Sequence, residues 1–307
     1  AGSRGLISRL MESKLFRDDH MVSDEQQLNK QIGRGQLAVG VVIPSNFEQQ
    51  LEERHQAKVR IILDGVDAYT AGIANVQLKQ VISEFEPLEK NEHKAVVPSI
   101  SILYNPDLRS SWYFIPGVLG AMLTLTSTLV SSSVLLREKE LGTLEQLLLT
   151  PYETWEILLG KIAPIFALLM CDAGVAVLTG MLVFGVPFRG DVGLFALASA
   201  LYVFVGIGLG MMLATVCRTE RQSHLVSFFV NVPVMQLSGA VVPFETMPKL
   251  LQDIGTLDPL RYFTVIARSL MIKGAGFGAL WPDLLALFMF ALALFCFSLK
   301  QFRRQLS

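Results

Sequence analysis

Five long apolar runs dominate the pattern of hydrophobic and polar positions in the second half of the chain. They lie near residues 112–136, 162–186, 192–217, 223–242 and 280–299. Each run has roughly 20 residues, enough for an α-helix to cross the apolar core of a bilayer. The pattern therefore predicts an α-helical polytopic membrane domain over residues 111–307, with five spans visible in the sequence.

The first 110 residues follow a different pattern, in which short β-rich runs alternate with amphipathic stretches. Strands are expected at residues 37–43, 59–63 and 100–104, and a long helix at 69–85. Helices that alternate with short strands are typical of a small α/β domain. We therefore expect residues 1–110 to form such a domain outside the membrane.

Basic residues orient the predicted spans. The short loops and the tail that follow the first, third and fifth runs contain Arg137, Lys139, Lys161, Arg218, Arg221, Lys300, Arg303 and Arg304. Short loops rich in Lys and Arg remain in the cytoplasm, so these segments are predicted to be cytoplasmic. An odd number of spans then makes residues 1–110 extracytoplasmic. Because no apolar segment precedes them here, we expect a sixth span on the N-terminal side that this sequence does not contain.

Composition agrees with a membrane protein that carries a soluble part. Hydrophobic residues make up 51% of the chain and charged residues 17%, with a mean hydropathy of +0.46 and a net charge of −1. No basic stripe with interleaved aromatic residues occurs, which argues against a nucleic-acid partner. The sequence also lacks a phosphate-binding loop and metal-ligand spacing. It therefore predicts no catalytic residue, no metal and no cofactor in this chain, and argues against an enzyme.

A charged segment from Arg137 to Lys161 separates the first two apolar runs. Leu141, Leu144 and Leu148 recur at helical spacing, so a helix here would gather them on one face. Two capping patterns follow, Thr143 with Gln146 and Thr150 with Glu153; Pro151 then falls at the first position of a second helix. From the periodicity alone, this segment could equally be an interfacial connector between two spans.

The same segment resembles the signature loop of ABC type 2 exporter permeases. The residues that carry the resemblance and the expected ATPase-coupling role are Glu138, Glu140, Gly142, Thr143, Leu144, Glu145, Leu148 and Pro151. In that family the loop holds a coupling helix, expected here at residues 138–150, which docks into a separate ATP-binding subunit. The resemblance thus implies that ATP and Mg belong to the partner ATPase and not to this chain.

The resemblance also implies a setting for the whole chain. It predicts a multi-pass protein of the bacterial inner membrane that exports drug-like or lipophilic compounds, with residues 1–110 extracytoplasmic. A second permease copy or a sister permease would complete the pathway within the lipid. A periplasmic adaptor protein and an outer-membrane channel are further partners that the family suggests. Six spans are usual in the family, in agreement with the sixth span expected above.

Several polar residues interrupt the predicted spans. Candidates for lining the pathway or the dimer contact are Thr124, Ser127, Ser131, Asp172 and Asn231. Small hydroxyl residues also let helices pack closely in lipid, so ordinary packing is the competing interpretation. A carboxylate at the bilayer centre costs about 2.5 to 3.5 kcal/mol, so Asp172 should face protein or water. Local hydrogen bonding is favoured for it over a proton or cation relay.

A non-enzymatic alternative to export is also compatible with these patterns. The chain could be a membrane scaffold or sensor, with an external ligand-binding domain and an inner helix that docks a signalling partner. Loss of stimulation of a partner ATPase by substrate would favour this alternative. The substrate itself does not follow from the residues.

Overall fold

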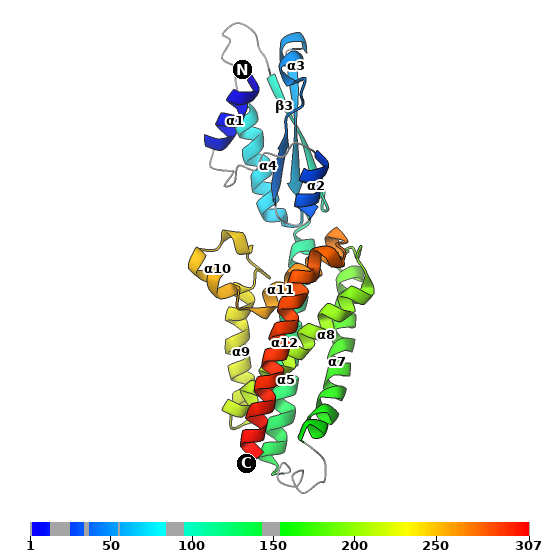
Figure 1. The fold of residues 1–307 in the computed structure, drawn as a ribbon, viewed down its shortest axis with the longest axis vertical. Coiled ribbons are helices and arrows are strands. Elements are labelled where there is room, and N and C mark those ends of the chain that lie inside the picture. Colours follow the sequence, from blue (N-terminus) through cyan, green and yellow to red (C-terminus); the bar gives the residue numbers. More distant parts are fainter. Residues whose placement is uncertain are drawn as a thin grey trace. The chain divides into compact units, whose positions relative to one another are not determined.

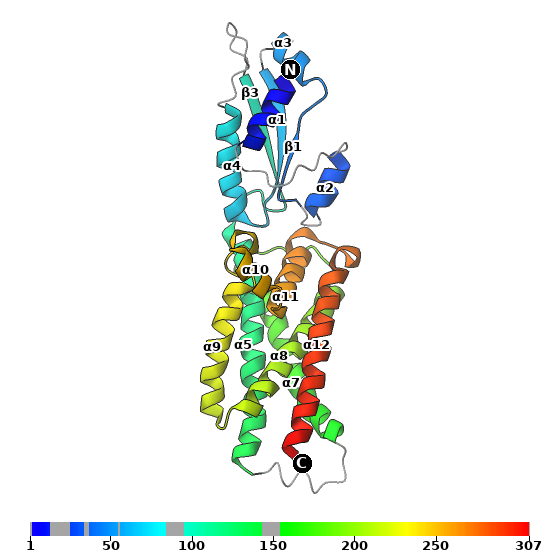
Figure 2. The same ribbon diagram turned by 60° about the vertical axis from the view of Figure 1, so that its left-hand side comes forward.

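The computed structural model describes residues 2–12, 25–33, 37–54, 56–83, 95–142 and 154–306. The chain divides into two compact units, Ala1–Tyr113 and Phe114–Ser307. This division falls close to the boundary at residue 110 expected from the sequence. Figures 1 and 2 show the elements of both units, which are described separately below.

The first unit is a small α/β structure with one mixed sheet. Its elements are α1 (Gly2–Glu12), α2 (Glu25–Gly33), β1 (Val39–Val42), α3 (Phe47–Arg54), β2 (Gln56–Asp64), α4 (Ala68–Ser83) and β3 (Ala95–Leu103). The strand order is β1-β2-β3, with β1 antiparallel and β3 parallel to β2. All three predicted strands and the predicted long helix are present in this unit.

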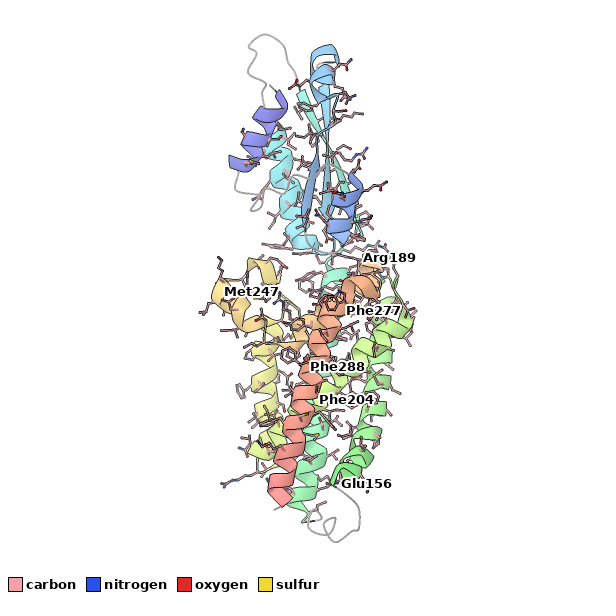
Figure 3. All side chains as sticks on the ribbon, in the orientation of Figure 1. Glu156, Arg189, Phe204, Met247, Phe277 and Phe288 are labelled. Carbon is pink, nitrogen blue, oxygen red and sulfur yellow. The ribbon has the colours of Figure 1, made fainter. Side chains whose placement is uncertain are left out.

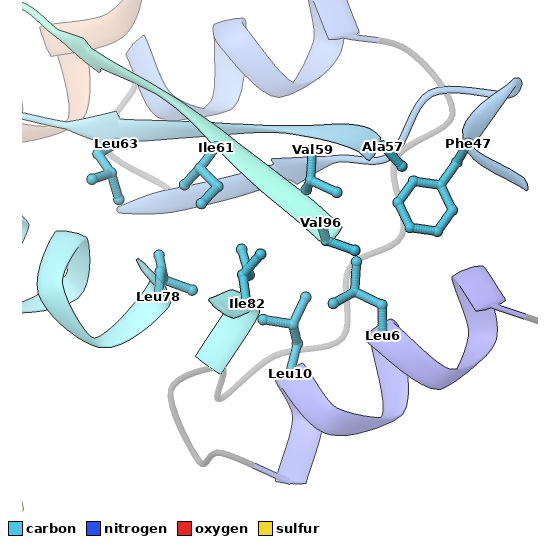
Figure 4. Close-up of a cluster of buried hydrophobic side chains, with 10 residues drawn as sticks. All are labelled: Leu6, Leu10, Phe47, Ala57, Val59, Ile61, Leu63, Leu78, Ile82 and Val96. Atoms are coloured by element: carbon cyan, nitrogen blue, oxygen red, sulfur yellow. The ribbon is translucent and has the colours of Figure 1, made fainter. Parts of the chain in front are cut away.

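The central strand β2 has buried apolar side chains on both of its faces, while Lys58 and Arg60 on one face are exposed. Alternate residues Val59, Ile61 and Leu63 pack against the side chains of α1, α3 and α4, as Figure 4 shows. On the opposite face, Ile62 packs against Leu28 and other side chains centred on α2. The period-two alternation of a strand thus divides its side chains between two small cores.

Turns at the strand ends depend on particular residues. A Cβ atom at Gly65 would lie 2.7 Å from the carbonyl oxygen of Leu103, so only glycine fits there. Beyond β3, the buried side chain of Asn105 closes the turn that leads into the next helix. Its Oδ1 accepts from the Arg109 amide (3.0 Å), and its Nδ2 donates to the Arg109 carbonyl (3.1 Å).

The second unit is a helical bundle. Its elements are α5 (Ser110–Glu140, which begins in the first unit), α7 (Thr154–Leu182), α8 (Val192–Val216), α9 (Glu220–Leu237), η1 (Phe244–Thr246), α10 (Lys249–Gly255), α11 (Pro259–Arg268), the π-helix η2 (Ser269–Lys273) and α12 (Phe277–Leu306). Both views show α9 along one side of the bundle (Figures 1 and 2). The end of α5 and the C-terminus lie at the same end of this unit.

Among the described residues, four helical segments are long and apolar enough to cross a membrane. They are Ser110–Glu140, Leu159–Leu182, Val192–Val216 and Phe277–Ser298. The predicted run at residues 223–242, the fourth along the chain, does form a helix, α9, but this helix is not one of the four. It is shorter than predicted because it ends at Leu237, and it begins with the charged residues Glu220 and Arg221. Four of the five predicted spans are therefore supported by length and composition.

The opposite end of the bundle contains short helices between α9 and α12. One of them, α10, ends at Gly255. Gly255 is buried against the Leu237 carbonyl and the ring of Phe244, where a larger residue would not fit. Figure 3 shows Arg189 and Phe277 at this end of the unit and Glu156 at the other.

Candidate functional site

The helix α5 ends immediately before the predicted coupling segment. Gly142 follows its last turn with φ = 68°, in the left-handed region that glycine adopts without strain. The Leu141 amide still donates to the Arg137 carbonyl at 3.0 Å. Glu138 and Glu140 therefore belong to α5, and not to a separate helix beginning at residue 138. The reason is that the helical hydrogen bonds continue as far as this glycine.

Glu138 connects α5 to α7. Its Oε2 forms an ion pair with the Nζ of Lys161, and both side chains are more than two-thirds buried. Partial burial weakens solvent screening, so this pair is stronger than a fully exposed one. The two helices are thereby joined on either side of the predicted coupling segment.

Glu140 connects α5 to α9. Its Oε1 accepts a hydrogen bond of 2.8 Å from the backbone amide of Glu220, the first residue of α9. The first amides of a helix have no partner within the helix, and the helix dipole favours a negative charge there. The carboxylate at residue 140 meets both requirements.

The other predicted coupling residues lie outside the described part of the chain. They are Thr143, Leu144, Glu145, Leu148 and Pro151. Their ATPase-coupling role stays a prediction, as does the role of Glu138, Glu140 and Gly142 in coupling.

Inside the bundle, α5 packs closely on the glycines of α8. A Cβ atom at Gly206 would lie 2.7 Å from the Cβ of Ser127, and one at Gly210 would lie 2.7 Å from the Thr128 carbonyl oxygen. Gly208 faces the other way, where an added Cβ would lie 2.8 Å from the Cβ of Leu294 on α12. The alternating glycines thus allow α8 to approach α5 on one face and α12 on the other.

The contact register gives the direction of the two helices. The hydroxyl groups of Thr124 and Tyr202 share a hydrogen bond, and the contact of Ser127 with Gly206 follows about one turn further along both helices. The residue numbers rise together, so α5 and α8 run parallel. This is the direction expected if α7 crosses the membrane between them.

The hydroxyl side chains on this face of α5 are buried and bonded to their own helix. Thr124 Oγ1 donates to the Gly120 carbonyl at 2.9 Å, and Ser131 Oγ donates to the Ser127 carbonyl. Such bonds to the preceding turn satisfy a hydroxyl where water is absent. Thr124, Ser127 and Ser131 therefore face α8 in the described chain. A role for them in lining a pathway or contacting a second copy stays a prediction.

The two other candidate polar residues make local contacts. Asp172 on α7 is partly buried, and its Oδ2 accepts from Thr126 Oγ1 on α5 at 3.1 Å. Asn231 Nδ2 on α9 donates to the Ser227 carbonyl one turn earlier, at 2.8 Å. These contacts give both residues hydrogen-bond partners within the chain; whether either also lines the pathway stays a prediction.

We expect Asp172→Asn to retain expression and at least about half of wild-type transport. The amide oxygen of asparagine can accept the same bond from Thr126, so a local role survives the loss of charge. Asp172→Leu, which has no acceptor, serves as the contrast. Transport by purified protein in vesicles is the measurement. A large loss of transport in Asp172→Asn at normal expression would instead support a proton or cation relay.

At the other end of the bundle, a buried carboxyl group, that of Asp258, lies at the start of α11. Asp258 begins this helix with Oδ1 accepting from the Leu260 amide at 2.9 Å, and only 7% of the residue is exposed. Its Oδ2 is buried without a hydrogen-bond partner in the described structure. Burial raises the pKa of Asp258 to about 7, opposed by the Leu260 amide and the Arg261 guanidinium.

Aromatic contacts hold the short helices at this end together. The guanidinium carbon of Arg261 lies 3.6 Å from the ring centre of Phe244, and the rings of Tyr202 and Phe263 stack 4.3 Å apart. The sequence signal that could have identified this site is Asp258 followed by Pro259, which is typical of a helix start.

The first unit has an open groove between α2 and the sheet. Its volume is about 390 Å³, and residues of α2, β2 and β3 line it. Glu25 and Arg60 form an ion pair of 2.7 Å there, and both side chains are largely exposed. The polar side chains of Glu25, Asn29 and Arg60 are among those that line the groove.

Comparison with known proteins identifies the family. The sequence model of the ABC-2 family transporter proteins matches residues 1–300. The permease YbhR of Escherichia coli K12, named a probable multidrug ABC transporter permease, is 30% identical over 285 residues, covering 91% of this chain and 77% of that protein. The inner membrane transport permease YhhJ of the same strain is 29% identical over 295 residues, covering 92% and 77%.

A third relative agrees with these two. The probable multidrug permease YbhS of Escherichia coli K12 is 28% identical over 265 residues, covering 83% of this chain and 70% of that protein. No solved structure matches the chain. The family match extends over nearly all of the sequence and accompanies four apolar membrane-length helices. The chain therefore belongs to the ABC-2 family of transporter proteins and is a multi-pass membrane permease.

Proposed function

We propose that this permease is the membrane-spanning subunit of an ATP-driven exporter of drug-like or lipophilic compounds. The observation that carries the proposal is the end of α5, where Glu138 and Glu140 join it to α7 and α9 immediately before the segment 143–153. A partner that moves this segment would move three helices at once. The multidrug names of the relatives support the substrate class.

Separate ABC ATP-binding subunits are the proposed source of that movement. They bind ATP and Mg, and close on the coupling segment of two permease chains from the cytoplasm. The chains are two copies or a pair with a sister permease. Nucleotide then biases an equilibrium between an inward-open and an outward-open pathway through contacts that differ between the two states. This chain transports, and the partner hydrolyses ATP.

The proposed membrane arrangement puts the chain in the bacterial inner membrane. It includes α9 as a fifth span and a sixth span outside this sequence. The first unit is then extracytoplasmic, where an adaptor protein and an outer-membrane channel would meet it. The basic residues at the ends of α5 and α8 support the cytoplasmic assignment of those ends.

The test is affinity purification of the permease in mild detergent, with mass spectrometry of the proteins that accompany it. We expect wild type to recover an ATP-binding-cassette subunit, and Leu144→Asp to recover about tenfold less. The reason is that a charge on the apolar face of the coupling helix opposes its burial in the partner. Lys139→Asp, at an exposed position of α5 outside that apolar face, is the comparison. Equal recovery by wild type and Leu144→Asp would exclude Leu144 as a docking residue.

The second candidate function is that of a scaffold or sensor, and the groove of the first unit is where such a protein would bind its ligand. A scaffold or sensor would bind a ligand at Arg60 and Glu25 and would signal through the inner segment without transport. Recovery of a signalling protein in place of an ATPase would favour it. Transport that depends on ATP in reconstituted vesicles would exclude it.

A further inference from the structure

The contact between α5 and α9 has two points, one turn apart on α9. Glu140 accepts from the Glu220 amide at 2.8 Å, and Ser133 Oγ lies 2.6 Å from Nε2 of His224. Residues 133 and 140 are seven apart and share one face of α5, and residues 220 and 224 share one face of α9. Because one number rises while the other falls, the two helices are antiparallel here.

Hydrogen bonds within residues 218–222 also hold the first turn of α9. Thr219 Oγ1 accepts from the Gln222 amide at 3.2 Å, and Gln222 Oε1 accepts from the Arg218 amide at 2.9 Å. These bonds make the turn a compact unit. Glu140 on α5 thus holds this first turn in place by accepting a hydrogen bond from the terminal amide of α9.

The position of Glu140 in the chain gives the contact its significance. It is the last residue of α5, and Gly142 separates it from the segment 143–153. A displacement of that segment reaches residue 140 first. Glu138, two residues earlier, points to a different partner and reaches α7 through Lys161. The two carboxylates therefore direct one movement to two helices.

We propose that Glu140 is a positioning residue that transmits displacement of the segment 143–153 to α9. This inference rests on the proposed exporter function. Without the Glu140 contact, the partner ATPase would still dock on the permease and its movement would reach α5 and α7, but it would reach α9 only through the weaker second contact, between Ser133 and His224. Loss of the contact would then reduce transport without reducing ATPase binding.

The test compares Glu140→Ala and Glu140→Gln with Lys139→Ala, an exposed neighbour on the same turn. Amide hydrogen exchange of the purified permease should show the Glu220 amide exchanging about three- to tenfold faster in Glu140→Ala. Glutamine keeps an acceptor oxygen, so Glu140→Gln should remain close to wild type. Lys139→Ala should leave the exchange unchanged. Unchanged exchange in Glu140→Ala would overturn the proposal.

A second measurement tests transmission with the ATPase complex. Glu140→Ala should co-purify the ATPase as wild type does, while ATP-driven transport in vesicles falls about fivefold. Rescue of transport in Glu140→Gln would support a role for the acceptor oxygen. Normal transport in Glu140→Ala despite faster exchange would overturn the proposal, leaving a contact that only stabilises the fold. Failure of wild type itself to bind an ATPase would instead overturn the exporter function, and this inference with it.

Discussion

Gly206→Leu is expected to prevent the membrane unit from folding. Even a single Cβ atom at this position would lie 2.7 Å from the Cβ of Ser127, in a seam where α5 and α8 are in contact. Overpacking a tight interface costs about 1–3 kcal/mol for a few added atoms, and a whole leucine side chain exceeds what the seam can absorb. Size-exclusion chromatography in detergent should show aggregated or degraded protein in place of a single species.

The control for this substitution is Gly174→Leu on α7. An added Cβ at Gly174 meets no atom within 4 Å, so the same change in the same kind of helix should be tolerated. A reciprocal pair sharpens the test: Gly206→Ala alone should be destabilising, and Ser127→Gly together with it should restore stability. Equal behaviour of Gly206→Leu and Gly174→Leu would show that α5 and α8 do not pack as described.

Asp258→Asn is expected to stabilise the permease at pH 8 and to do so less at pH 5. A carboxyl with its ordinary pKa of 3.8 ionises above about pH 4 when α11 is detached, whereas the buried Asp258 ionises only near pH 7. The folded permease, in which α11 is packed, therefore loses stability relative to the state with α11 detached as pH rises from about 4 to 7. Above pH 7 this loss stays constant. The upper limit of the loss is about 4 kcal/mol.

Asparagine removes this penalty while its side-chain oxygen can still accept from the Leu260 amide. Thermal unfolding of both proteins between pH 5 and 8 is the measurement, and the difference between them isolates residue 258 from all other titrating groups. Asp253→Asn, at an exposed carboxylate of α10, is the matched control and should show no such pH-dependent gain. A constant difference between wild type and Asp258→Asn across this range would contradict the burial of an unpaired carboxyl oxygen.

Local patterns in the sequence predicted most elements because their causes are local. The alternation in β2 and the length of the apolar runs follow from period and bilayer thickness. Gly206, Gly208 and Gly210 are a further local feature, because residues without a side chain allow helices to pack closely, and α5 and α12 lie against them. In each case the feature can be predicted from residues that are close together in the sequence.

Contacts between distant residues were not predictable in this way. Glu140 and Glu220 lie 80 positions apart, and no pattern near either residue indicates the other. The burial of Asp258 likewise depends on how α11 folds back into the bundle. The run that forms α9 was predicted as a span from its apolar residues. Because α9 has a charged first turn and ends at Leu237, it is not among the helices that are long and apolar enough to cross a membrane.

The length of α5 determines how far from the bilayer core the proposed docking segment begins. Its 31 residues are helical throughout, with Pro116 in the second turn, and span about 46 Å at 1.5 Å per residue. The apolar core of a bilayer is about 30 Å thick, so roughly 16 Å of the helix extends into the headgroups and water. Because an α-helix is stiff, a displacement of its projecting end would change the tilt of the part within the lipid. In the proposed export mechanism, an ATPase docked near this end would drive the pathway without entering the hydrocarbon.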